Sequence, residues 1–473
     1  MSGADPLSSL PQAATAALLR AALQDRTAGV LIGSAVGDAI GLYTEFMSAA
    51  HAAAAYPSRT FTLARGPHHS PTPFKLDAHR APKEPGYWTD DTDHALLLLL
   101  GFLHTASSSS SSSSTSSAST APGGAGSEPS LPLPTQQDFA QRLRVWAQTG
   151  LRALETMPLG LGRLVGSVVA TAGFADEPER VAREYWERTG RRVAPNGSLM
   201  RTHPLGLICL FRAEEEAFDL AARISRVTHV DPRCVLACVI GTGLVRRVVR
   251  GEVVSEGDVD ASVERAVRWF QEQKDDEGLG LDLEELMRHV NPEGGLDGLK
   301  LDEQVAIGYV YKTLGSGVVL LRMAIRRVAA VKGVLLDRSR LFEDLITDLI
   351  MCGGDADTNA CFAGALLGGY LGYSALPDHW KHGLKHQEWL LGKSDALCRV
   401  LGLMDGSYNG KEDADTEVYG GRPILSQDEM EARWMALQQT AFEKMEEAAK
   451  ASASKVSGSG WSLPWQSKNK AGR

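Results

Sequence analysis

The segment that most constrains the fold is residues 360–373, a run of small and apolar residues that follows the motif Gly-Gly-Asp-Ala-Asp-Thr at 353–358. A run this apolar and this rich in small side chains is not typical of a surface loop, so we expect a buried helix that other helices approach closely. Paired glycines allow the backbone to turn tightly just before that helix. The carboxylates of Asp355 and Asp357 should therefore stand at the N-terminus of a buried helix.

A second acidic motif, Thr-Asp-Asp-Thr-Asp at 89–93, precedes another apolar segment, for which we predict a helix over 94–103. Burial disfavours a charged carboxylate, and a helix N-terminus offsets only up to about 1 kcal/mol of that cost. Threonine and aspartate are ordinary helix caps, so two well-capped helices are the simple alternative. One cap needs only one acceptor, whereas each motif supplies two or three carboxylates. We therefore favour the interpretation that the two motifs meet and hold a hard cation.

Strand signals are nearly absent, because the sequence has neither alternating Val/Ile/Thr runs nor hairpin turns. We expect an all-α protein, a compact single-domain helical bundle with a central dinuclear metal cleft where helix starts converge. Glycines 29, 33, 37 and 41 recur at a spacing of four, which places them on one face of a helix. Each costs about 1 kcal/mol relative to alanine, so we expect close helix packing along this face.

The predicted domain organisation has one main domain with a low-complexity insertion. Polyserine followed by Gly, Ala and Pro cannot bury enough apolar surface to order itself, and Ser426 with Glu429 forms a capping box at the start of a C-terminal helix. The expected parts are an N-terminal lead-in (1–25), an all-α domain (26–402) with a disordered Ser-rich insertion (105–135), a C-terminal loop and helix (403–450) and a disordered tail (451–473).

One stretch of the C-terminal region, Glu-Asp-Ala-Asp-Thr at 412–416, repeats part of the 353–358 motif. It lacks the paired glycines before it and the apolar segment after it. We therefore predict a solvated loop there and no site.

Composition and charge narrow the function classes. The formal net charge is −9 and no basic stripe is evident, which argues against general nucleic-acid binding. The six cysteines are scattered without a CxxC pair, so neither a zinc knuckle nor a disulfide framework is indicated. We see no signal peptide and no apolar stretch of membrane-spanning length. We expect a monomer of the cytoplasm or nucleus that does not bind membranes.

A third motif lies at 194–201, where Asn196-Gly197 predicts a tight turn. Ser198 and nearby amides could meet an anion, and Arg201 could either do the same or pair with a buried acid. Thr228-His229 opens another apolar helix; a single histidine there is more often structural than catalytic, although histidine titrates near neutral pH. Glu45 is a lone acid that could equally be a surface carboxylate at a helix end.

Taken together and in order, these motifs resemble the ADP-ribosylglycohydrolase family, which includes dinitrogenase reductase-activating glycohydrolase and the ADP-ribosyl-acceptor hydrolases. The resemblance covers residues 28–373 and leaves out the serine-rich insertion and the C-terminal region. It is carried by Gly37-Asp38-Ala39 with Glu45-Phe46, by Trp88-Thr89-Asp90-Asp91-Thr92, by Asn196-Gly197-Ser198-Leu199-Met200-Arg201, by Thr228-His229, and by the 353–358 motif.

The resemblance implies an all-α fold with two Mg²⁺ ions in a cleft, where Mn²⁺ could replace Mg²⁺. Glu45 would lie beside the metals as a ligand or gate. A set of carboxylate and hydroxyl oxygens also suits Mg²⁺, Mn²⁺ or Ca²⁺ better than Zn²⁺. The implied metal ligands are Thr89, Asp90, Asp91, Asp355, Asp357 and Thr358.

The implied reaction is hydrolysis of the glycosidic bond between ADP-ribose and a side chain of an ADP-ribosylated protein, or of a small ADP-riboside. Such chemistry needs an acid and a base around an oxocarbenium-like state, and Glu45, Asp90 and Asp91 are the unranked candidates. An inactive ADP-ribose-binding or structural relative is the alternative; the retained pairs of carboxylates favour the enzyme. The linkage, to arginine, serine or another group, is left open. Ribose and diphosphate would contact Asn196, Gly197, Ser198 and His229.

Overall fold

The computed structural model describes residues 12–64, 70–108, 131–273, 281–331 and 336–458. Within these ranges the regular secondary structure is helical, apart from one antiparallel pair of two-residue strands, β1 (Ser107–Ser108) and β2 (Tyr408–Asn409). The prediction of an all-α fold is confirmed. None of the described helices is both long and apolar enough to cross a bilayer.

The chain divides into two compact units, one formed by residues 1–72 and 85–424 and the other by 73–84 and 425–473. The first unit carries all predicted site residues. Its helices are α1 (Gln12–Gly41), α2 (Ala49–Ala55), α3 (Asp90–Thr105), α4 (Gln136–Thr149), α5 (Arg163–Val169), α6 (Pro178–Arg188), α7 (His203–Ile208), α8 (Glu214–Arg226), α9 (Pro232–Val249), α10 (Glu256–Glu272), α11 (Leu283–Val290), α12 (Val310–Ala330), α13 (Arg338–Ile350), α14 (Ala356–Leu371), α15 (Asp378–Lys381) and α16 (Gln387–Val400).

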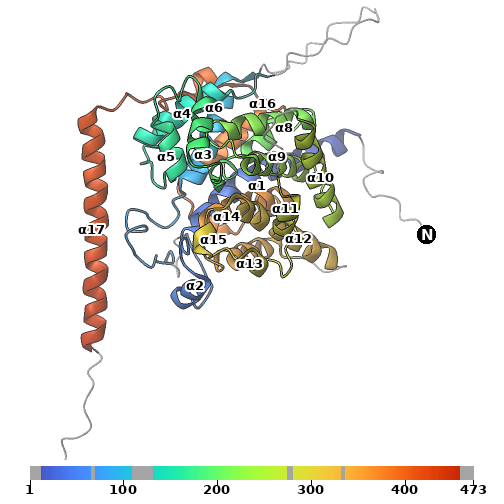
Figure 1. The fold of residues 1–473 in the computed structure, drawn as a ribbon. Helices are drawn as coiled ribbons and strands as arrows, with labels where there is room; N and C mark the ends of the chain where they lie inside the picture. The colour runs from blue at the N-terminus through green and yellow to red at the C-terminus, as the bar shows by residue number, and fades with distance from the viewer. Residues whose placement is uncertain (1–11, 65–69, 109–130, 274–280, 332–335, 459–473) are drawn as a thin grey trace, which may run out of the picture. The chain divides into compact units, whose positions relative to one another are not determined.

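The packing of α1 against α14 forms the centre of the first unit (Figure 1). A Cβ atom added at Gly37 would lie 2.0 Å from the carbonyl oxygen of Ala360, and one added at Gly41 would lie 2.3 Å from the Cα of Asp357. The predicted glycine face of α1 therefore packs directly on the helix that follows the 353–358 motif. This contact sets the last turn of α1 against Asp357, which is how the core positions the site.

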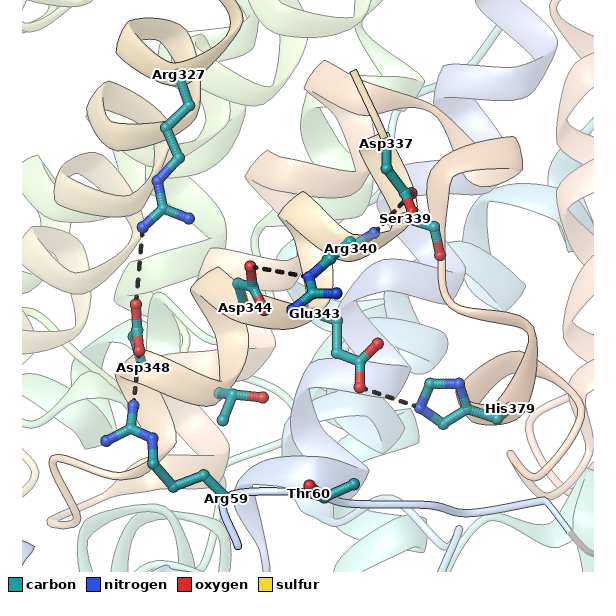
Figure 2. A pocket seen from close by; sticks show the side chains of 11 residues that line it. Arg59, Thr60, Arg327, Asp337, Ser339, Arg340, Glu343, Asp344, Asp348 and His379 are labelled. Atoms are coloured by element: carbon teal, nitrogen blue, oxygen red, sulfur yellow. Dashed lines mark hydrogen bonds and ion pairs between the residues drawn. The ribbon is translucent and has the colours of Figure 1, made fainter. Parts of the chain in front are cut away.

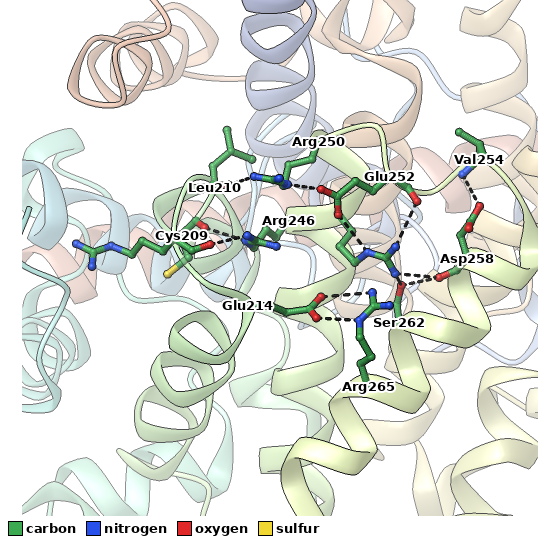
Figure 3. Close-up of polar contacts among 12 residues, drawn as sticks. Cys209, Leu210, Glu214, Arg246, Arg250, Glu252, Val254, Asp258, Ser262 and Arg265 are labelled. Atoms are coloured by element: carbon green, nitrogen blue, oxygen red, sulfur yellow. Dashed lines mark hydrogen bonds and ion pairs between the residues drawn. The ribbon is translucent and has the colours of Figure 1, made fainter. Parts of the chain in front are cut away.

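The C-terminal end of α7 is held by Arg246 of α9 and by Arg250, the residue that follows α9 (Figure 3). Arg246 Nε donates to the carbonyl oxygen of Cys209 at 3.0 Å, and Arg250 Nη1 donates to that of Leu210 at 2.9 Å. Arg265 of α10 pairs with Glu214 at the start of α8 at 2.8 Å. Because the last carbonyls of a helix have no partner within it, the arginines fasten the end of α7 to α9, the helix that follows His229, while the Arg265–Glu214 pair fastens α8 to α10.

The predicted solvated loop at 412–416 is correct only in part: Glu412 and Ala414 are exposed, but the other residues are held by the protein. Lys393 of α16 is buried and donates to both oxygens of Asp413, at 2.8 and 2.7 Å, and its Nζ lies 2.9 Å from Asp415. Thr416 is fully buried. A buried ammonium group requires opposite charge beside it, so the two carboxylates fold inward onto Lys393.

Several expected boundaries fall inside helices or outside the described residues. The border at 25–26 lies within α1, and α3 continues to Thr105, inside the expected Ser-rich insertion. Residues 109–130 and 459–473, most of the insertion and much of the expected tail, lie outside the described residues.

The second unit contains α17 (Gln427–Gly458), which continues beyond the predicted end at 450. The predicted capping box is confirmed: the Ser426 amide donates to Glu429 Oε2 at 2.8 Å, and the Glu429 amide donates to Ser426 Oγ at 3.3 Å. Lys444 of α17 donates to the carbonyl oxygen of Lys83 within the same unit at 3.3 Å.

Candidate metal centre

Two groups of carboxylates meet where α1, α3 and α14 converge. Oxygen atoms of Asp38, Asp91 and Asp357 all lie within 4.8 Å of one another, and the same is true of Glu45, Asp355 and Asp357. Asp357 belongs to both groups. The two acidic motifs, more than 250 residues apart in the sequence, are therefore face to face in the structure.

A cavity of about 420 Å³ opens onto all of these carboxylates except Asp38. Nine of the residues predicted for the site line it, whereas Thr89 and Ser198 are not among the lining residues. The nine are Glu45, Asp90, Asp91, Asn196, Gly197, His229, Asp355, Asp357 and Thr358. We call this cavity the acidic cleft.

Asp38 fixes the start of α3, and the sequence analysis did not single it out as a site residue. Its carboxylate accepts hydrogen bonds from the Thr89 amide at 2.9 Å, the Thr92 amide at 3.1 Å and the Thr92 hydroxyl at 2.6 Å. Thr89, the residue before the helix, does not cap it through its side chain; its hydroxyl donates instead to Asp91 Oδ2 at 2.9 Å. The sequence signal that could have identified Asp38 is an acidic residue within an apolar helix that carries a face of glycines.

Burial and mutual repulsion disturb the ionisation of these acids. Burial, followed by the charge of Asp357, raises the pKa of Asp91 well above its usual range, and the same two causes raise the pKa of Asp355. Burial and Asp357 also raise the pKa of Asp38 to about 7, although the hydrogen bonds from Thr92 and Thr89 oppose the shift. A cation between the carboxylates would remove the cause of this repulsion.

The donor atoms of the acidic cleft fit a hard divalent cation. Asp91 Oδ1 is buried and has no hydrogen-bond partner among the described residues. A buried carboxylate oxygen without a donor is costly, and a metal ion would satisfy it. Both groups of clustered ligands consist of carboxylates alone, a set typical of Mg²⁺, Mn²⁺ or Ca²⁺ and not of Zn²⁺.

The paired glycines hold Glu45 beside the 353–358 motif. Gly353 and Gly354 have φ angles of 69° and 75°, the left-handed region that favours glycine. The amide of Phe46 donates to the Gly354 carbonyl at 2.6 Å, and the Gly354 amide donates to the Met47 carbonyl at 2.9 Å. Glu45 is only 5% exposed, so it lies buried at the cleft and is not a surface carboxylate.

Asn196 orients Asp355. Its side-chain Nδ2 donates to Asp355 Oδ2 and to Thr313 Oγ1, both at 2.9 Å, while its backbone amide donates to the Gly308 carbonyl at 3.0 Å. The turn predicted at Asn196 is therefore tied to the start of α12. Thr313 was not predicted, and nothing in its local sequence marks it.

Gly197 and His229 lie against each other in the cleft. A Cβ atom added at Gly197 would be 3.3 Å from His229 Nε2, so only glycine leaves the imidazole its full space. Ser198 points elsewhere: it is fully buried, and its hydroxyl lies 3.2 Å from Ser225 Oγ and 3.3 Å from Cys238 Sγ. Ser198 therefore supports the wall behind the cleft.

Comparison with known proteins agrees with this arrangement. A family model described as ADP-ribosylglycohydrolase matches residues 19–410, which include every carboxylate of the cleft. The chain belongs to the ADP-ribosylglycohydrolase family. The resemblance inferred from the motifs is thus confirmed.

Two similar proteins extend the comparison. The chain is 25% identical over 374 residues to an uncharacterised protein of Archaeoglobus fulgidus, covering 78% of this chain and 94% of that protein. A solved structure described as an ADP-ribosylglycohydrolase-related protein complex is 24% identical, covers 80% of this chain and 99% of its own, and has a TM-score of 0.48.

In this ADP-ribosylglycohydrolase family member, Arg201 does not line the acidic cleft and pairs with no buried acid among the described residues. It is fully buried, its guanidinium lies 4.7 Å from the ring centroid of Phe139, and its Nη2 donates to Thr228 Oγ1 at 2.7 Å. Of the two alternatives raised for Arg201 by the sequence, pairing with a buried acid is therefore not found among the described residues.

The far wall of the acidic cleft was not predicted. It comes from α5 and α6 and the turn before α5, and includes Arg163, Leu164, Tyr185 and Thr189. Gly160 has a φ of 102°, and a Cβ atom there would lie 2.1 Å from Asp90 Oδ1. Glycine at 160 therefore lets the wall approach Asp90. These residues carry no recognisable motif, and only the tertiary packing of α5 and α6 brings them to the site.

A second cavity, of about 700 Å³, has a different character (Figure 2). Arg59 lies 2.6 Å and Arg327 3.9 Å from Asp348, and His379 lies 3.3 Å from Glu343. Its charges are thus paired with one another, and it contains none of the predicted site residues. The acidic cleft of the family member instead brings several carboxylates close to one another and contains the predicted site residues, which is why it is the candidate site.

Proposed function

We propose that this protein is a magnesium-dependent hydrolase that cleaves the glycosidic bond between ADP-ribose and a modified protein side chain, or the corresponding bond of a small ADP-riboside. The observation that carries the proposal is the meeting of Asp91 and Asp357 beside an open cavity. Membership of the ADP-ribosylglycohydrolase family supports the reaction class. Mn²⁺ could take the place of Mg²⁺.

The residues proposed to hold two metal ions come from both acidic motifs. Bound Mg²⁺ would supply the positive charge that neutralises the carboxylates and attracts hydroxyl oxygens of the ribose. Asp38 contributes by fixing Thr89 and Thr92, and Asn196 by orienting Asp355. The proposed ligands are Thr89, Asp90, Asp91, Asp355, Asp357 and Thr358.

The acid–base steps are assigned to Glu45, Asp90 and Asp91. Glycoside hydrolysis requires one carboxyl group that donates a proton to the leaving group and one that accepts a proton from water. Glu45 reaches the cleft from the end of α1, whereas Asp90 and Asp91 reach it from α3. Carboxyl groups on two separate elements can divide these two tasks.

The decisive experiment measures release of free ADP-ribose from arginine-, serine- and phosphate-linked substrates, offered in parallel to metal-depleted protein with and without added Mg²⁺. We expect release from at least one substrate, dependent on Mg²⁺ and restored by Mn²⁺. Zn²⁺ serves as the control, because an all-oxygen site disfavours it. Release that is unaffected by metal depletion would contradict the proposal. ADP-ribose binding without release from any substrate would instead support a non-catalytic binder.

A further inference from the structure

A chain of hydrogen bonds runs from the protein interior to the acidic cleft behind His229. Arg201 Nη2 donates to Thr228 Oγ1 at 2.7 Å, and Thr228 Oγ1 lies 2.7 Å from His229 Nδ1. Arg201, Thr228 and His229 are all buried, and among the three only His229 lines the cleft.

The direction of this chain follows from the chemistry of its members. A guanidinium group can only donate, so the Thr228 hydroxyl oxygen accepts from Arg201. Among the described residues, the Thr228 hydroxyl has no hydrogen-bond partner other than Arg201 and His229. Its proton therefore has one available acceptor, Nδ1 of His229. An Nδ1 that accepts carries no proton, so the neutral ring carries its proton on Nε2.

The Nε2 of His229 is left as a donor without an acceptor. It is buried and unpartnered among the described residues, and it lies beside Gly197 at the cleft. A buried N–H group without an acceptor is destabilising, which indicates that a ligand completes it. Burial, followed by the charge of Arg201, lowers the pKa of His229 well below its usual range, so the ring stays neutral at physiological pH.

We propose that Arg201 and Thr228 are positioning residues that fix the proton of His229 on Nε2 and so present a neutral N–H donor to a phosphoryl oxygen of the bound ligand. An anionic acceptor is favoured because the buried guanidinium of Arg201 polarises the chain toward the cleft. The assignment of that oxygen to ADP-ribose rests on the proposed function, whereas the position of the proton does not.

The first test determines directly which ring nitrogen of His229 carries the proton. Nitrogen-15 chemical shifts of histidine in the full-length, ligand-free protein distinguish the two neutral tautomers. We expect His229 to be protonated on Nε2 in the parent protein and in Thr228→Ser, which keeps the hydroxyl. Thr228→Val, which keeps the shape and removes the hydroxyl, should give a mixture or the Nδ1-protonated form. A parent protein protonated on Nδ1, or a Thr228→Val variant unchanged from the parent, would overturn the proposal.

The second test measures how the Thr228 substitutions change the affinity for ADP-ribose. With Mg²⁺ present, we expect Thr228→Val to weaken ADP-ribose binding by about tenfold, the size of one lost hydrogen bond, and Thr228→Ser to stay within about twofold. The Nε2 proton resonance of the parent should move downfield when ADP-ribose binds. Equal weakening in Thr228→Ser and Thr228→Val, or an Nε2 resonance that does not move, would contradict the proposed role.

A matched control separates this role from packing. Thr202 is also buried in the same region, but its hydroxyl donates to the Leu199 carbonyl at 2.8 Å. It takes no part in the hydrogen bonds that link Arg201, Thr228 and His229. Thr202→Val should leave the His229 tautomer and ADP-ribose affinity unchanged. If the parent protein does not bind ADP-ribose at all, the proposed function fails, while the tautomer measurement in the ligand-free protein still decides the positioning role.

Discussion

The tetrapeptide Asp-Ala-Asp-Thr occurs twice in this protein, at 355–358 and at 413–416, and the two copies have opposite surroundings. In the second copy, Asp413 accepts hydrogen bonds from Lys393 and from the Tyr408 hydroxyl, the latter at 2.8 Å, and Asp415 accepts from Trp389 Nε1 at 2.8 Å. The second pair of carboxylates is thus satisfied by the protein itself.

The first copy faces other acids. Oxygens of Asp357 approach those of Asp91 and Glu45, and the carboxylates lie at an open cleft. The threonines differ in the same way: Thr358 lines the cleft, whereas the Thr416 hydroxyl is buried and donates to the Gly410 carbonyl at 2.8 Å. The comparison teaches that the neighbours of a motif decide whether its charges support the fold or remain available to a ligand.

The largest expected contrast comes from removing one carboxylate from each copy. Asp357→Ala should lower ADP-ribose release by more than about 100-fold and weaken Mg²⁺ binding, because even indirect disturbance of a metal site costs 10- to 100-fold. Asp415→Ala should change release by less than about threefold. Steady-state rates and calorimetric Mg²⁺ titrations of both folded variants provide the measurement. An unchanged rate and metal stoichiometry in Asp357→Ala would remove Asp357 from the site.

A change beside the second copy of the motif should instead affect the stability of the fold and leave activity intact. Lys393→Met removes the cation shared by Asp413 and Asp415 and should lower the free energy of unfolding by about 1–3 kcal/mol, since it leaves partly buried carboxylates without their partner. Release of ADP-ribose by the folded variant should be unaffected. Urea denaturation monitored by circular dichroism measures the first quantity. A variant as stable as the parent would show that Lys393 does not hold this copy inward.

A smaller effect is expected from removing the side-chain amide of Asn196, which orients Asp355 in the first copy of the motif. Asn196→Ala removes the hydrogen bond to Asp355 and should weaken Mg²⁺ binding by roughly tenfold. Tyr408→Phe removes the corresponding hydroxyl donor to Asp413 and serves as the control. Calorimetric titration should find its Mg²⁺ affinity unchanged. Equal affinities for all three proteins would mean that Asn196 does not position a ligand of the metal.

The smallest expected effect is the dependence of Mg²⁺ protection on pH. In metal-free protein the folded-state pKa of Asp38 is raised from 3.8 to about 7, and those of Asp91 and Asp355 are also raised. The folded state then binds more protons than the unfolded state between about pH 4 and 7, so these groups reduce stability as pH rises through that window.

Mg²⁺ competes with the same protons, so the stabilisation that it confers should grow from pH 5 to pH 8, by about 1.4 kcal/mol at fixed Mg²⁺ for each tenfold gain in affinity. Thermal unfolding of the parent with and without Mg²⁺ across this range measures the difference. Asp357→Ala should lose most of the protection and Asp415→Ala none of it. Protection by Mg²⁺ that is constant from pH 5 to pH 8 would contradict this assignment.

Features that depend on neighbouring residues in the chain could be predicted well. The glycine face of α1, the tight turn at 353–354 and the capping box at Ser426 are local patterns, because helix packing and capping are set by residues a few positions apart. The helical fold class followed from the absence of strand signals. The excess of carboxylates over what a helix cap requires predicted that the two acidic motifs would meet.

Other features depended on partners that are distant in the chain. Asp38 acts as the cap of α3 from 51 residues away, and Lys393 turns the 413–416 copy of the motif inward. Arg201 proved to be a buried donor to Thr228, and α5 and α6 supply a cleft wall that carries no motif. The sequence by itself determined the helical fold class, the glycine face of α1 and the capping box of α17. Only the tertiary structure decided which charges face each other, because electrostatic interactions depend on distances in space and on burial.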